Sequence, residues 1–76
     1  MISGIVITTE RDERAVSHVK RAIGARPEIE LGESNGVKLP ATLEADDESS
    51  ARELVDWIQQ IPGVSQVDVV CVHFDP

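Results

Sequence analysis

The residue types that carry out most protein chemistry are sparse in this sequence. It has two histidines, His18 and His73, and one cysteine, Cys71. None of them has a sequence neighbour at the spacing of a nucleophile–base pair or of a metal site. The five glycines are dispersed and do not form a phosphate-binding loop. We therefore expect a protein that is not an enzyme and that binds no cofactor or metal ion.

The most prominent group of charges is the carboxylate run Asp46, Asp47 and Glu48. Three consecutive carboxylates lack the convergent geometry that a bound cation needs. The run directly precedes a stretch of apolar residues at helical spacing, where negative charges suit the positive end of the helix dipole. We interpret the run as the start of a helix.

The net charge of −7 is unevenly distributed along the chain. Residues 1–38 contain six basic and six acidic residues, whereas residues 39–76 contain one basic and eight acidic residues and carry the whole net charge. The acidic second half repels phosphate backbones, which argues against nucleic-acid binding, and it attracts a cationic partner. An acidic surface that only keeps a small protein soluble is the alternative.

In the first half of the chain, hydrophobic periodicity predicts a strand, a helix and a second strand. Residues 2–9 are mostly β-branched and apolar, as in a strand. Apolar residues recur at helical spacing over 15–23, and Gly24 and Pro27 end this helix. Residues 28–34 alternate between apolar and polar, which predicts a short strand.

The second half repeats the pattern. Asn35-Gly36 predicts a hairpin turn, since both positions tolerate positive φ, and the return strand is expected over 37–44. An apolar stripe over 51–61 predicts a helix that Pro62-Gly63 ends, and residues 64–74 form the last strand.

The element order β-α-β-β-α-β predicts one α+β domain over residues 1–76, with the ferredoxin-like split βαββαβ fold. Its four-stranded antiparallel sheet has both helices on one face. Pro40 lies in a strand that is central in this topology and has no N–H to donate, so we expect a bulge or a missing hydrogen bond there.

Two helices on one face leave the other face of the sheet bare, and we call it the open face. Period-2 alternation directs Ile5, Ile7, Val67, Val69 and Cys71 toward the helices. The same alternation predicts an apolar patch with neighbouring carboxylates on the open face, formed by Gly4, Val6, Thr8, Glu28, Glu30, Asp68, Val70, Val72 and Phe74, with Lys38, Pro40 and Thr42 beside them.

An exposed apolar patch usually marks a partner. Its carboxylates make it complementary to a basic amphipathic peptide, and a homodimer formed through the same face is an equal alternative. The apolar run 2–7 is too short for an export signal, and no stretch approaches the roughly 20 apolar residues of a membrane span. We expect the chain to remain in the cytoplasm.

Four stretches resemble the NapD family: ISGIVITTERDE, LPATLEADDESSARELVDWIQ, IPGVSQVDVV and VHFD. The resemblance implies a cytoplasmic chaperone that binds the twin-arginine signal peptide of the periplasmic nitrate reductase catalytic subunit and delays export until its cofactors are inserted. Without the resemblance, a small-molecule-sensing or dimerising regulatory module of the ACT or Lrp-effector type is the alternative.

Overall fold

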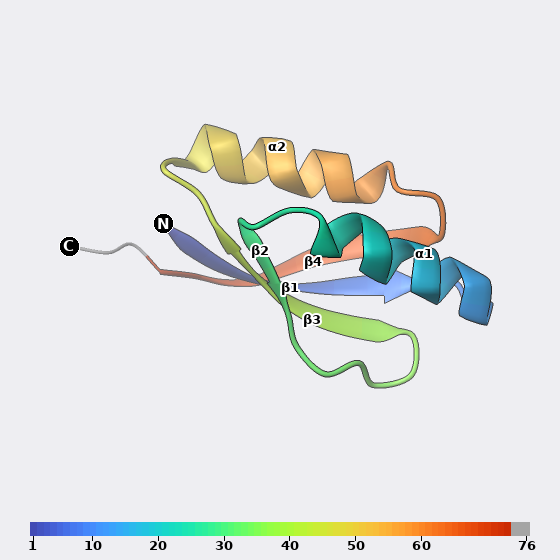
Figure 1. Ribbon diagram of the computed structural model, residues 1–76. Helices are drawn as coiled ribbons and strands as arrows, with labels where there is room; N and C mark the ends of the chain where they lie inside the picture. The colour runs from blue at the N-terminus through green and yellow to red at the C-terminus, as the bar shows by residue number, and fades with distance from the viewer. Residues whose placement is uncertain (74–76) are drawn as a thin grey trace.

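A computed structural model describes residues 1–73, which form four strands and two helices (Figure 1). The elements are β1 (Ile2–Thr9), α1 (Glu13–Gly24), β2 (Ile29–Leu31), β3 (Lys38–Glu44), α2 (Glu48–Gln59) and β4 (Val64–His73). The strands form one antiparallel sheet in the order β2-β3-β1-β4. Both helices lie on the same face of this sheet (Figure 1). The predicted ferredoxin-like α+β fold is confirmed.

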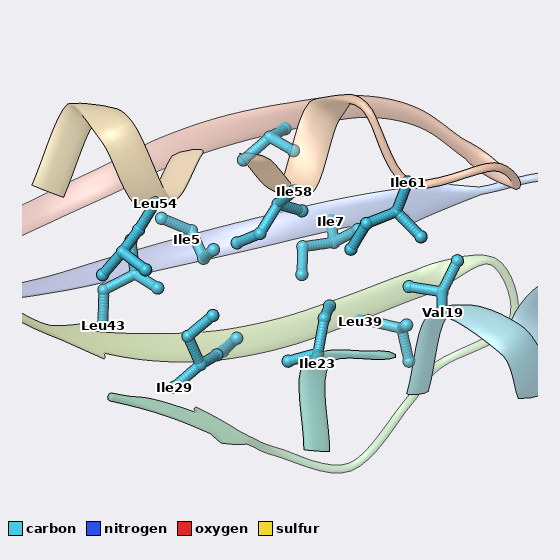
Figure 2. Close-up of a cluster of buried hydrophobic side chains, with 12 residues drawn as sticks. Ile5, Ile7, Val19, Ile23, Ile29, Leu39, Leu43, Leu54, Ile58 and Ile61 are labelled. Carbon is cyan, nitrogen blue, oxygen red and sulfur yellow. The ribbon is translucent and has the colours of Figure 1, made fainter. Parts of the chain in front are cut away.

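The core lies between the helix layer and the covered face of the sheet (Figure 2). In β1 and β3 every second residue is buried, as period-2 alternation requires for a sheet with one covered face. Seven side chains are 1% exposed or less: Ile5, Ile7, Val19, Ile23, Leu39, Leu43 and Ile58. The predicted inward direction of Ile5 and Ile7 is therefore confirmed.

The hairpin between β2 and β3 turns one residue later than the sequence predicted. Backbone hydrogen bonds join Asn35 and Lys38 in both directions, at 2.9 and 3.1 Å, which places Gly36 and Val37 at the centre of the turn. Gly36 has a φ of +63°, and Asn35 has no positive φ. A positive φ at the first central position alone corresponds to a type II′ turn, whereas the predicted Asn-Gly turn needs both. Strand β2 is also shorter than the predicted 28–34.

Pro40 lies at a position where the absence of its backbone N–H removes little hydrogen bonding from the sheet. It faces Val6 of β1 in an uninterrupted register, so there is no bulge at this position. On the other side, Gly32 N–H donates to the carbonyl of Pro40 at 2.8 Å, and Pro40 has no N–H to return the bond. Strand β2 ends at Leu31, directly before this point. The missing hydrogen bond that the sequence predicted therefore falls at the end of an edge strand.

The carboxylate run starts α2, as interpreted from the sequence. Asp47 is the N-cap and accepts a hydrogen bond from Ser50 N–H at 2.8 Å, and Glu48 lies in the first turn. Hydrogen bonds from the backbone and the hydroxyl of Ser50 hold the pKa of the Asp47 carboxyl below its ordinary value of 3.8. The charged form of Asp47 is thus favoured in the folded protein.

Replacing Asp47 with asparagine keeps an N-capping side chain and removes the titratable charge. We expect the wild-type protein to be more stable than Asp47→Asn at about pH 7, because a carboxyl with a lowered folded pKa stabilises the fold above its unfolded pKa. This advantage is lost as the pH falls through the lowered pKa. Urea denaturation of both proteins at about pH 7 and about pH 3 measures the difference, and an equal difference at both values would contradict the assignment.

Candidate functional site

The open face of the sheet is lined by the side chains of β1 that alternate with the buried isoleucines. Gly4, Val6 and Thr8 lie there, and each is half-buried. In the β1–β3 register they pair with Thr42, Pro40 and Lys38 of β3, which are exposed on the same face. Neither helix covers this side of the sheet (Figure 1). The role of these residues in binding stays a prediction.

Strands β2 and β3 add polar groups to the open face. Lys38 Nζ donates to Thr8 Oγ1 at 2.9 Å, across the β1–β3 pair. Glu30 is exposed and pairs with Thr42, on the side opposite to the buried Ile29. The open face therefore carries the positive charge of Lys38 as well as the negative charge of Glu30.

A β-bulge in β4 changes which of its side chains reach the open face. Gly4 pairs with Cys71 and the next residue, Ile5, pairs with Val69, so Val70 has no partner of its own in β1. A bulge of this kind inserts one extra residue into one strand. Side chains beyond it point to the face opposite to the one that simple alternation predicts.

Two predicted directions in β4 are consequently wrong, and a third residue is more exposed than predicted. Val72 pairs with the buried Ser3 and lies on the helix side, where it lines a hollow with residues of α2, and not on the open face. Cys71 pairs with Gly4 and is exposed on the open face, although alternation placed it in the core. Val69 points to the helix side as predicted but is 52% exposed, so it does not belong to the core.

Gly4 provides the space that the Cys71 side chain occupies. A Cβ atom built on Gly4 would lie 2.7 Å from Cys71 Sγ and 3.7 Å from a methyl group of Val70. Val70 and Cys71 both lie against Gly4 on the open face for this reason. A glycine in a central strand is typical of such a close approach, and here the approaching group is a side chain.

Asp68 lies on the open face and is held by a neighbour on its own strand. It pairs with Val6 across the β1–β4 ladder. The Nε2 amide of Gln66 donates to both carboxylate oxygens, at 2.9 and 2.8 Å, and the pair is exposed. The carboxylate is therefore fixed beside Val6 and has room for a further cationic partner.

Glu28 does not belong to the open face, contrary to the prediction. Its Oε2 lies 3.7 Å from Nη1 of Arg26. The guanidinium of Arg26 stacks 4.3 Å from the centroid of the Trp57 ring, on α2. Glu28 directly precedes β2, and its carboxylate turns toward this cation at the helix side. Phe74 lies outside the described residues.

The described side chains of the open face combine apolar groups with carboxylates. Within residues 1–73 no cluster of three or more histidine, cysteine, aspartate or glutamate side chains could hold a metal ion. Apolar groups of Val6, Pro40 and Val70 form the middle of the face, and Glu30 and Asp68 contribute carboxylates to it. Such a surface can bury an apolar segment and attract a neighbouring cation.

Neither helix in the described part of the chain is long and apolar enough to cross a membrane.

Comparisons with known proteins are consistent with one another. A family model described as "NapD protein" matches residues 1–76. The solution structure of the E. coli Tat proofreading chaperone protein NapD has a TM-score of 0.82 and 18% sequence identity, with 99% of this chain and 79% of that chain covered. At this identity the structural likeness shows the fold. No curated protein matches the chain.

The contact between Gly4 and Cys71 predicts a coupled mutational effect. We expect Gly4→Ala to lower the free energy of unfolding by about 1–3 kcal/mol, because its new methyl group would meet Cys71 Sγ. Adding Cys71→Ala to the same chain should recover most of that loss. Urea denaturation of the wild type, both single variants and the double variant measures the coupling, and additive effects would contradict the contact.

Proposed function

Because the chain belongs to the NapD family, we propose that it is a chaperone that binds the twin-arginine signal peptide of the periplasmic nitrate reductase catalytic subunit. By holding this peptide it would delay export until the cofactors of the client are inserted. The family match over residues 1–76 is the observation that carries the proposal. The fold shared with the E. coli Tat proofreading chaperone supports it.

We propose the open face as the docking surface. A twin-arginine peptide has a basic region followed by an apolar stretch, and the open face offers counterparts to both. Glu30 and Asp68 are exposed carboxylates that can pair with arginine, for which bidentate carboxylate contacts are the preferred geometry. Val6 and Val70 present apolar surface for the stretch that follows.

We propose a binding role rather than a catalytic one, since the described side chains of the open face are apolar groups and exposed carboxylates that suit a basic, partly apolar peptide. We propose that the protein acts in the cytoplasm, where a signal peptide is available before export. It would then act without inserting into the membrane and without a cofactor of its own.

A lysine at Val6 tests the docking surface. We expect Val6→Lys to weaken binding of a synthetic twin-arginine signal peptide by at least about tenfold, since it adds a positive charge beside Asp68 and removes apolar surface. Ser17→Lys adds the same charge on the exposed side of α1, away from the open face, and should leave the affinity unchanged. Isothermal titration calorimetry measures both affinities.

Two further results decide the proposal. Replacing both arginines of the peptide with glutamine should weaken binding, and the weakening should shrink in the double variant Glu30→Gln with Asp68→Asn. Absence of saturable heat with the wild-type protein would overturn the chaperone role. Equal weakening by Val6→Lys and Ser17→Lys would instead overturn the open face as the docking surface.

A further inference from the structure

The free edge strand β4 carries the large hydrophobic side chains that are exposed in the described part of the chain. Val69, Val70 and Val72 are 52%, 62% and 44% exposed, and they are the large hydrophobic side chains that residues 1–73 leave exposed. Strand β4 lies at one edge of the sheet and pairs only with β1. Residues 64–73 contain no lysine, arginine or proline, the residues that commonly protect such an edge from pairing.

The bulge distributes these valines over both faces of the sheet. Val70 lies against Gly4 on the open face, whereas Val69 and Val72 line a hollow of about 240 Å³ on the helix side. The same hollow is lined by apolar groups of α2, Ala51 and Val55. A partner on one face of the sheet would leave the other valines exposed. A strand placed alongside β4 projects side chains to both faces and covers all of them.

The backbone of β4 is also free to pair. Thr9 N–H donates to the carbonyl of Val37. In this register the backbone N–H and carbonyl groups of the odd-numbered residues of β1 point toward β3. Ile5 and Ile7 therefore have no backbone bonds to their β4 partners, Val69 and Val67. The N–H and carbonyl groups of these two valines point away from the sheet, and a further strand could bond to them.

The charges around this edge allow a second copy of the chain to dock, despite the net charge of −7. The rim of the hollow carries one residue of each sign, Glu48 and Arg52. Asp68 is the one carboxylate between residues 64 and 73, and it is hydrogen-bonded to Gln66. The edge thus carries little of the negative charge that would make two copies repel each other.

We propose that two copies of this chain pair through their β4 strands, antiparallel and about a two-fold axis perpendicular to the sheet. Both β4 strands are already extended, so little chain ordering opposes their association. Because of the two-fold axis, the valines of one copy contact the same valines of the other copy. The product is a continuous eight-stranded sheet in which the four helices share one face.

This dimer does not depend on the proposed function. Both open faces remain uncovered on the same side of the continuous sheet, so peptide binding and dimer formation are compatible. A face-to-face dimer, the arrangement that the sequence left open, would instead cover them.

Sedimentation equilibrium of the full chain at concentrations from about 10 µM to about 1 mM tests the proposal. We expect a concentration-dependent mass that approaches two chains. Val69→Lys should weaken the dimer by at least about tenfold, and Val72→Lys should act in the same direction. Val6→Lys, on the open face and away from the edge, should leave the dimer unchanged. Circular dichroism verifies that each variant is folded.

Hydrogen exchange gives a second measurement that needs no substitution. The amides of Val67 and Val69 should exchange more slowly as the concentration rises, because they become hydrogen-bonded across the two-fold axis. A single-chain mass at all concentrations would overturn the dimer, as would a dimer that Val6→Lys breaks and Val69→Lys does not. A monomer that still binds the signal peptide would overturn the dimer alone and leave the proposed function standing.

Discussion

The arrangement of the whole molecule depends on the burial of the isoleucine side chains of β1 beneath the two helices. Ile5 and Ile7 are 1% and 0% exposed and lie at the centre of the sheet, between β3 and β4. Because side chains alternate along a strand, burying these two residues fixes Gly4, Val6 and Thr8 on the opposite face. A one-residue slip of β1 would exchange the two sets, so the covered face and the open face are determined together.

The second constraint is local and comes from β4. The extra residue at Val70 reverses the alternation of the strand between its first and second halves. Cys71 is thereby placed over Gly4, where there is room for its sulfur, and Val72 is placed beside α2. The inserted residue therefore moves Val72 from the open face to the helix side. The open face loses apolar surface, and apolar surface appears at the edge of the sheet.

The sequence predicts the parts of the fold that rest on periodicity. Element order, sheet topology and the buried side of β1 follow from alternation, helical spacing and turn residues, and α2 starts where the carboxylates of Asp47 and Glu48 predicted. Period-2 alternation contains no signal for a bulge, so the directions of Cys71 and Val72 were assigned wrongly. Glu28 was misplaced because its carboxylate lies beside Arg26, and the position of Arg26 depends on its stacking on Trp57, which belongs to α2 and is distant in the sequence.

The positions of several carboxylates explain what part of the uneven negative charge does in the structure. Asp47 caps α2 and Glu48 lies in its first turn, so part of the acidic second half stabilises a helix. Glu28 is paired with Arg26. Glu30 and Asp68 remain on the open face, which also carries Lys38. If the open face is the docking surface proposed above, attraction of a cationic peptide would rest on these few carboxylates, and the apolar surface between them would supply much of the affinity.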